Sequence, residues 1–255
     1  MAGLQLDWYD SQAATVLPAM LASLPAGEHV AEQAMLRTWA NMPMAEPGEA
    51  AALLFQAWYL QVARSVFAPI LGDGLYRRLL SESYMVNKAL DPLLLDDGSS
   101  PWWDGRKATL LSDALGNASR NLGSQLGKPP ADWRLDDKQS VGLNHELAAA
   151  VPALATLFSA EAQPWGGTPA AVGRANYDYR EPFEVDHGAT VRAVGSMGAP
   201  VAMASVIPGG QSGHPLSPHY LDQFEPWRRG ELLPIDATPP GRAAVTLEPL
   251  GKLAD

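Results

Sequence analysis

Apolar residues recur at spacings of three and four positions through much of the first two thirds of the chain. This spacing is typical of helices that bury one face. It predicts a helix over residues 11–24, a second over 30–42, and a third that opens at Pro47 and ends before Pro69. The positions expected to be buried are Ala14, Leu17, Leu21 and Leu24 in the first helix, Val30, Ala34 and Met35 in the second, and Ala51, Leu54, Phe55, Trp58 and Val62 in the third.

The helical pattern resumes after a turn-rich stretch over residues 91–102. This stretch contains the run DDGSSP at residues 96–101, which is typical of a loop. A helix over residues 107–126 is expected to end at Gly127, because glycine readily adopts the left-handed conformation that ends many helices. A further helix is predicted over residues 143–158.

After Gly166-Gly167 the pattern changes to short runs of β-prone residues. Residues 189–194 and 200–207 predict an antiparallel pair of strands, and residues 243–247 predict a last strand. Helices followed by strands indicate an α+β fold. No linker divides the chain, so we expect a single domain, mainly helical over 1–165 and built of antiparallel strands over 166–255.

Composition narrows the class of protein. Hydrophobic residues make up 47% of the 255 positions and charged residues 18%, which indicates a folded globular protein. The net charge of −10 and the lack of a basic stripe argue against nucleic acid as a partner. No apolar run approaches the roughly 20 residues that span a bilayer, so no membrane partner is expected. The absence of cysteine excludes disulfides and zinc–thiolate sites.

The most distinctive segment is GQSGHPLSPHYLDQ at residues 210–223, followed by Trp227 and Gly230. It strongly resembles the C-terminal signature of the penicillin amidase family, which reads GQSG-x-P-x-S-x-H-Y-x-D-Q-x-x-x-W-x-x-G. The signature positions that we expect to be structural are Gly210, Gln211, Ser212, Gly213, Ser217, His219, Tyr220, Asp222, Gln223 and Trp227.

A weaker resemblance to the same family covers nearly the whole chain. Gln5, Asp7 and Ser11 are similar to the family's segment M-x-x-x-Q-x-D-x-x-S. Ala40 departs from the pattern, because the family commonly has aspartate there, and so does the run at residues 135–137. Other similar segments are Leu36 with Trp39, residues 50–58, Trp133 with His145, Gly166-Gly167, Asn176-Tyr177 and residues 188–192.

The resemblance implies an N-terminal nucleophile hydrolase with a four-layer αββα core. Such enzymes cleave linear amides: the acyl side chains of β-lactams, which links them to antibiotic metabolism, or those of homoserine lactones and lipopeptides. The attacking serine is residue 1 of a processed chain, and its α-amine serves as the general base. The resemblance implies that this serine, the oxyanion hole and the calcium ligands lie upstream of Met1. The chain would then be a partial domain, the C-terminal part of a β-subunit.

Several expectations follow from that placement. The chain would contain no catalytic residue, no cofactor and no metal site, and it would be inactive alone. Its partners would be the missing part of the β-subunit and the α-subunit, with a small acyl-amide substrate in the complete enzyme. The full-length parent would be periplasmic or secreted. The chain as given has no signal peptide, so by itself it is expected in the cytoplasm.

Ser217, His219 and Asp222 have the residue types of a hydrolytic triad. Triad members normally come from distant parts of a chain, with histidine bridging the other two, so neighbours two and three positions apart fit poorly. Ser212 lacks the glycine two residues on that a G-x-S-x-G nucleophile elbow requires. We interpret the segment as structural, with Ser217 capping a helix around residues 218–227 and the other polar side chains tethering the loop.

Other candidate sites have equally plain interpretations. His145-Glu146 lacks a recognised metal-site spacing. Asp91, Asp96 and Asp97 with Gly98 lack the alternating ligands of a calcium loop, which favours a solvated turn. Five tryptophans could line an acyl pocket, but their spacing favours core positions. These are Trp39, Trp58, Trp102, Trp103 and Trp133.

Two functions therefore remain open. The first is the C-terminal portion of a penicillin amidase-type acylase. The second is a non-catalytic binding or scaffold protein made from this portion alone. A self-sufficient serine hydrolase that uses Ser212 or Ser217 is disfavoured by the spacing described above.

Overall fold

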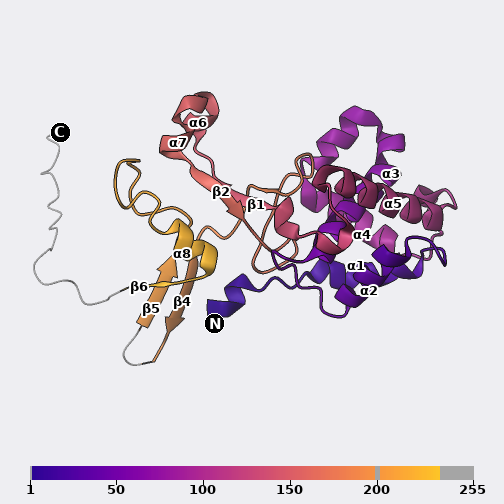
Figure 1. Ribbon diagram of the computed structural model, residues 1–255, viewed down its shortest axis with the longest axis horizontal. Coiled ribbons are helices and arrows are strands. Elements are labelled where there is room, and N and C mark those ends of the chain that lie inside the picture. Colours follow the sequence, from indigo (N-terminus) through magenta and orange to yellow (C-terminus); the bar gives the residue numbers. More distant parts are fainter. Residues whose placement is uncertain (1, 199–201, 236–255) are drawn as a thin grey trace, which may run out of the picture.

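The computed structural model describes residues 2–198 and 202–235, which form a helical part and a smaller strand-bearing part along the long axis of the molecule (Figure 1). The main helices are α1 (Ser11–Ala22), α2 (Val30–Ala40), α3 (Ala50–Leu80), α4 (Ser83–Leu95) and α5 (Lys107–Leu126). Short 3-10 turns cover Ala2–Leu6, Pro101–Trp103, Pro130–Asp132, Leu135–Asp137 and Pro152–Leu154. The predicted α+β organisation is confirmed.

Local signals explain where these helices begin and end. The Asp10 carboxylate accepts a hydrogen bond from the Ala13 amide at 2.8 Å and so caps the first turn of α1. Glu49 caps α3 in the same way, through the Ala51 amide at 3.0 Å. α5 ends as predicted at Gly127, whose φ of 64° lies in the left-handed region.

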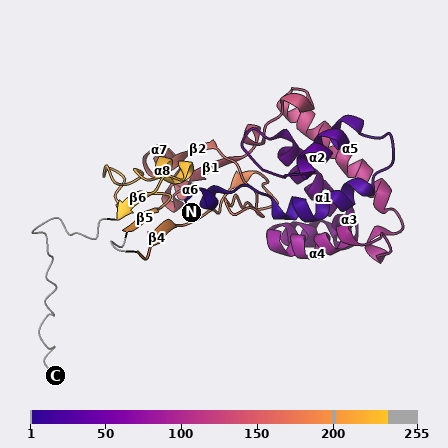
Figure 2. The ribbon, with the colours of Figure 1, turned by 90° about the horizontal axis from the view of Figure 1, so that it is seen from below.

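The predicted stripe of α3 is buried in full, and the helix is the centre of the helical part. It packs side by side with α5, and α1 lies between α2 and α4 (Figure 2). The stripes of the two shorter helices were predicted less well. In α1 the buried face includes Ala13, Val16 and Met20, which border Leu17 and Leu21, because this helix has neighbours on two sides. In α2 only Leu36 and Trp39 are buried, since its first turn extends away from the core.

Proline misled the prediction at three places, because the sequence predicts Pro47 in the first turn of the third helix, Pro69 at its end, and Pro92 within a turn-rich stretch. α3 begins at Ala50, after Pro47, and continues through Pro69 to Leu80, with its non-helical break at Gly72 (φ 70°). α4 contains Pro92, although the sequence predicts turns there. Proline removes one amide donor and restricts the residue before it. The buried residues of α4, Val86, Leu90 and Leu94, maintain the helix across that loss.

The predicted helix over residues 143–158 is also wrong. β1 (Ser140–Leu143) pairs antiparallel with β2 (Ala160–Pro164) and parallel with β3 (Glu184–Val185). Between β1 and β2 lie two short helices, α6 (Glu146–Ala150) and α7 (Ala155–Phe158), separated at Pro152. Strands thus begin at Ser140, earlier than the boundary expected at residue 166. The α6–α7 segment rises above the sheet (Figure 1).

The antiparallel pair predicted after Gly188 is confirmed. β4 (Arg192–Ser196) pairs with β5 (Ala202–Val206), and β5 pairs with β6 (Leu233–Ile235). The last predicted strand, residues 243–247, lies outside the described residues. A second cluster of buried side chains, which includes Trp165 and Trp227, draws its members from both sheets and from α8 (Phe224–Arg229). None of the described helices is both long enough and apolar enough to cross a bilayer.

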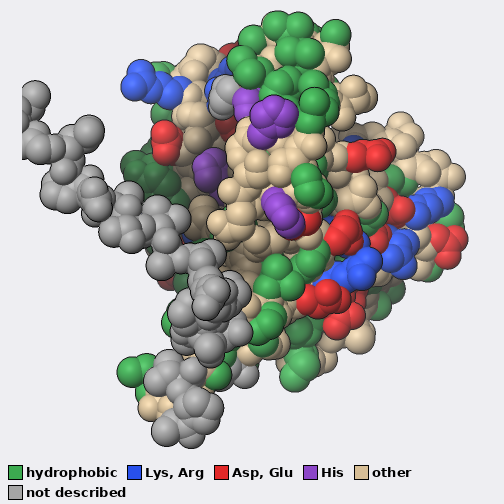
Figure 3. Space-filling model, turned by 90° about the vertical axis from the view of Figure 1, so that its left-hand side faces the viewer, with side chains coloured by type: hydrophobic (Ala, Val, Ile, Leu, Met, Phe, Trp, Pro, Cys, Tyr) green, Lys and Arg blue, Asp and Glu red, His purple; other side chains and the backbone are tan. Residues whose placement is uncertain are grey.

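Charged and hydrophobic side chains are unevenly distributed on the end of the molecule that carries α8 and the second sheet (Figure 3). Hydrophobic side chains gather at the top of this face, and acidic and basic side chains are mixed at its right-hand side. On the outer face of the β4–β6 sheet, Met203, Leu233 and Ile235 are exposed.

Candidate functional site

The signature segment forms a closed loop between β5 and α8. The Ser212 amide donates to the His219 carbonyl at 3.0 Å, and the Gln223 amide donates to the Gly209 carbonyl at 3.0 Å. A Cβ atom at Gly210 would lie 2.1 Å from that same His219 carbonyl oxygen. Only glycine allows the two backbone segments to approach this closely.

Three signature side chains tie the loop to its neighbours. The Gln223 side-chain oxygen accepts from the Ile207 amide at 3.2 Å, where β5 ends. The Tyr220 hydroxyl donates to the Phe158 carbonyl at 2.7 Å and so reaches the end of α7. The Trp227 indole nitrogen donates to the Ala189 carbonyl at 2.8 Å, ahead of β4. The segment is therefore fastened to the β4–β6 sheet and to the α6–α7 segment.

The two serine hydroxyl groups of the signature accept hydrogen bonds from the loop's own backbone. Ser212 accepts from the His214 amide at 3.1 Å, and Ser217 accepts from the His219 amide at 3.2 Å. The His219 ring pairs with the Asp222 carboxylate at 2.9 Å. Within the described residues neither serine hydroxyl is hydrogen-bonded to this imidazole, so the dyad lacks the nucleophile that a triad requires.

Two expectations about individual signature residues are corrected. Ser217 does not cap a helix around residues 218–227: turns fill the start of that range, and α8 begins only at Phe224, after Gln223. Gln211 and Gly213 are both exposed, so neither is one of the buried polar or packing positions of the loop. The residues that hold the segment in place are therefore Gly210, Tyr220 and Gln223, together with Trp227 in α8.

Trp227 is also the centre of an aromatic and cationic stack. Its ring lies parallel to that of Trp165, with centroids 5.1 Å apart and an angle of 5° between the rings. The Arg192 guanidinium lies 4.6 Å from the Trp227 ring centroid and donates to the Trp227 carbonyl. Arg192 is 2% exposed, and burial lowers its pKa to about 10. No carboxylate among the described residues pairs with it.

A second polar group that sequence reasoning missed lies in the helical part. Asp10 is fully buried, and its carboxylate accepts from the Gln56 side chain at 3.2 Å. Gln56 in turn accepts from the Tyr177 hydroxyl at 3.0 Å. Burial raises the pKa of Asp10 and, more strongly, that of Tyr177. The resemblance at Asn176-Tyr177 and the capping position of Asp10 were the only sequence signals for this connection.

Asp91 is the hydrogen-bond acceptor in a neighbouring cluster of polar side chains. It accepts from the Tyr59 hydroxyl at 2.7 Å and from the Gln12 side chain at 2.9 Å. Desolvation raises the pKa of Asp91 and that of Tyr59. Asp91 therefore lies inside α4 as a packing partner and is separate from the acidic turn to which its sequence position had assigned it.

The weaker N-terminal resemblance coincides with long-range contacts. The Gln5 side chain donates to the Ala193 carbonyl in β4 at 2.8 Å, and the Ser11 hydroxyl donates to the Ala170 carbonyl at 2.8 Å. Asp7 accepts locally from the Tyr9 amide at 2.9 Å. Nearby, Gly173 lies against Trp8, where a Cβ would be 2.7 Å from the ring. The first residues of the chain thus fasten the helical part to the strands.

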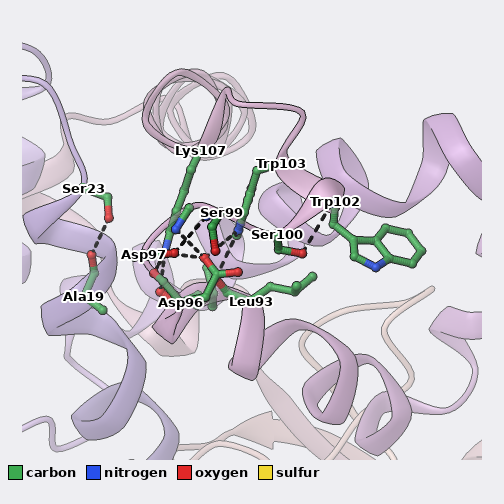
Figure 4. Close-up of polar contacts among 12 residues, drawn as sticks. Ala19, Ser23, Leu93, Asp96, Asp97, Ser99, Ser100, Trp102, Trp103 and Lys107 are labelled. Atoms are coloured by element: carbon green, nitrogen blue, oxygen red, sulfur yellow. Dashed lines mark hydrogen bonds and ion pairs between the residues drawn. The ribbon is translucent and has the colours of Figure 1, made fainter.

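The acidic turn after α4 is occupied by a cation of the protein itself (Figure 4). Lys107 lies 3.5 Å from the Asp96 carboxylate and donates to the Leu94 carbonyl at 2.8 Å. Trp103 donates to Asp96 at 3.1 Å, and Asp97 caps the Ser99 amide at 3.0 Å.

The other candidate metal position, His145, accepts from the Leu147 amide at the start of α6. Across the described ranges no three acidic or histidine side chains are grouped so as to hold a metal ion.

Four of the five singled-out tryptophans are core residues, as their spacing predicts. Trp39, Trp58, Trp103 and Trp133 are buried. Trp102 is 38% exposed, and its ring meets that of Phe67 edge-on, 5.4 Å away.

The class of protein follows from this arrangement. The structure is similar to that of a thermostable penicillin G acylase from Alcaligenes faecalis, with a TM-score of 0.52 at 16% identity. The match covers 95% of this chain and 47% of that one, and it shows that this chain has the fold of the corresponding part of that acylase. The family model described as penicillin amidase matches residues 1–244. The chain belongs to the penicillin amidase family.

Curated relatives agree with this membership. The chain is 26% identical over 237 residues to the acyl-homoserine lactone acylase QuiP of Pseudomonas putida, covering 87% of this chain and 28% of that protein. It is 31% identical over 140 residues to the penicillin acylase 2 proenzyme of a Pseudomonas species, covering 55% of this chain and 17% of that protein. The chain therefore spans less than a third of the length of these relatives.

Proposed function

We propose that this chain is the C-terminal portion of a penicillin amidase-type acylase that hydrolyses a linear amide, and that it has no amidase activity alone. The observation that carries the proposal is the structural role of the signature residues. Its serine hydroxyls accept hydrogen bonds from backbone amides, and Gly210, Tyr220 and Gln223 close and anchor the loop. Such a loop shapes a fold and supplies no attacking group.

The chemistry would be divided between this chain and the rest of the enzyme. An N-terminal serine elsewhere would attack the acyl carbon, forming an ester and releasing the amine, and water would then release the acid. Donors that stabilise the oxyanion would accompany that serine. This chain would contribute the helices and strands against which those parts fold, so its partners would be the remaining β-subunit and the α-subunit.

The substrate class rests on the relatives. These relatives are named as an acyl-homoserine lactone acylase and a penicillin acylase. Both names indicate an acyl group in amide linkage to a small amine. We propose the same bond type for the complete enzyme, in the periplasm or outside the cell, and the test below compares a homoserine lactone with a β-lactam as the substrate.

The test is co-expression. The chain alone and the chain with the remaining portion of its precursor would be assayed on a chromogenic acyl anilide, an acyl-homoserine lactone and penicillin G. We expect activity only in the assembly. Two variants, Ser212→Ala and Ser217→Ala, should keep that activity within a few-fold. Turnover by the chain alone that disappears in either variant would overturn the proposal in favour of a self-sufficient hydrolase.

A further inference from the structure

A cavity of about 330 Å³ lies between α3, α5 and residues 181–184. Its size falls in the range of small-molecule sites, about 300–1,000 Å³. Apolar side chains form its floor, among them Leu60, Ala118, Leu122 and Phe183. This floor is continuous with the buried core, because Ala118, Leu122 and Phe183 are themselves almost fully buried.

The rim of the cavity carries charges of both signs. Lys138, Glu181 and Glu184 are among the residues that line the cavity. The pairing of Ser140 with Glu184 between β1 and β3 fixes these groups near one another. Even so, no ion pair within 4.0 Å involves any of the three in the part of the chain that the structure describes.

The segment that carries the glutamates has a strained backbone. Phe183 has a φ of 76°, a value that a bulky residue rarely adopts. Its ring packs against Tyr177 with centroids 5.6 Å apart, and its carbonyl accepts from the Ser140 amide at 3.3 Å. These contacts hold a conformation that places the Phe183 ring on the floor and both glutamates on the rim. Strained residues of this kind cluster at ligand sites.

We propose that this cavity binds a small zwitterion with an apolar body, namely a free α-amino acid with an aromatic or branched side chain. The side chain would cover the apolar floor. The ammonium group would pair with Glu181 or Glu184, and the carboxylate would pair with Lys138. A ligand with both charges satisfies both signs of the rim, whereas a singly charged ligand leaves one sign without a partner.

The experiment compares three probes on the soluble form in which the chain is obtained. L-phenylalanine has both charges, N-acetyl-L-phenylalanine keeps only the carboxylate, and 2-phenylethylamine keeps only the ammonium. Binding is followed by ligand-observed NMR and calorimetry. We expect phenylalanine to bind best, with each single-charge probe about two- to fivefold weaker, the effect of one partly exposed ion pair.

Matched variants locate the site. Asn121 lies on the cavity rim and is exposed, so Asn121→Trp should block the cavity and abolish binding. Ser124→Trp adds the same side chain to an exposed position of α5 outside the cavity and should bind normally. Lys138→Ala should weaken phenylalanine about two- to fivefold and leave 2-phenylethylamine unchanged, with Lys88→Ala on α4 as its control.

Each outcome either supports or overturns the proposed ligand site. Loss of binding in Asn121→Trp with retention in Ser124→Trp, together with the charge preference, supports the proposal. Absence of saturable phenylalanine binding overturns it. So does equal binding of all three probes, or equal loss in the two tryptophan variants. Should Asn121→Trp fail to fold by circular dichroism, the response of Lys138→Ala decides. None of these readouts measures amidase activity, so this proposal and the proposed function can fail independently.

Discussion

The indole of Trp227 stacks on the indole of Trp165, with ring centroids 5.1 Å apart and an angle of 5° between the ring planes. The first residue belongs to the signature and the second follows β2, so the stack joins the signature to the first sheet. Both rings also face Arg192, whose guanidinium lies 5.7 Å from the Trp165 centroid and 4.6 Å from that of Trp227. The most recognisable motif of the chain thus acts through packing.

Trp227→Ala should reduce the free energy of unfolding by about 3–5 kcal/mol, because it removes a buried ring and leaves a cavity. Urea denaturation of the assembled protein measures this change. Trp102→Ala is the matched control: Trp102 is 38% exposed, so its loss should cost clearly less. Equal costs for the two substitutions would mean that the stack contributes nothing special.

Removing the charge of Arg192 is not expected to lower the free energy of unfolding, although the loss of a buried charged group usually does. Its pKa is lowered to about 10 by burial alone, so the charged group bears a desolvation cost. Arg192→Met keeps the apolar stem and removes the charge, and it should be neutral or stabilising. Arg192→Ala removes the stem as well and should destabilise by about 2–4 kcal/mol. A large loss in Arg192→Met would show that a carboxylate of the assembly pairs with this residue.

Gly210→Ala should disrupt the signature loop. The added Cβ would lie 2.1 Å from the His219 carbonyl, and the backbone must move, at a cost of about 1–3 kcal/mol. Limited proteolysis of the loop and thermal unfolding report this. Gly213→Ala in the same motif has nothing within 4 Å of the new atom and should behave like the parent. Similar sensitivity of the two variants would contradict the close approach seen here.

Asp10 should make stability depend on pH. Because burial raises its pKa in the folded state, the folded protein binds this proton more readily than the unfolded chain does. Its contribution is therefore most favourable below the unfolded pKa and declines as pH rises through the folded pKa. The stability of the parent relative to Asp10→Asn should rise as pH is lowered from neutral towards about 4. A difference that stays constant or falls would refute this assignment.

The outer face of the β4–β6 sheet predicts association of the chain when it is expressed alone. Met203 and Ile235 lie opposite each other on this face, are about half exposed, and have no charged neighbour in β4 or β5 on that side. Met203→Lys and Ile235→Lys should increase the soluble fraction, since charge on exposed strands opposes edge and face pairing. Met197→Lys, at a position already 95% exposed outside the strands, should change little.

The sequence predicted elements whose signals are local. Gly127 ends α5 because its own conformational freedom permits it, and the stripe of α3 is buried because one helix face must pack. Pro69 and Pro92 misled the prediction, since neighbouring packing outweighs the loss of one amide bond. The signature could be recognised from its letters, but the Asp10–Gln56–Tyr177 connection could not. Its members are 46 and 121 positions apart, and only the packed helices bring them together.

The hydrogen bond from Gln5 to the Ala193 carbonyl joins residues 188 positions apart. A contact of such high contact order cannot form during synthesis until most of the chain has left the ribosome. The helices from α1 to α5 can assemble earlier from shorter-range contacts, whereas the contact between the N-terminal turn and β4 must form late. A nascent chain stalled before residue 193 should therefore lack this contact and leave its first turn unfastened from β4.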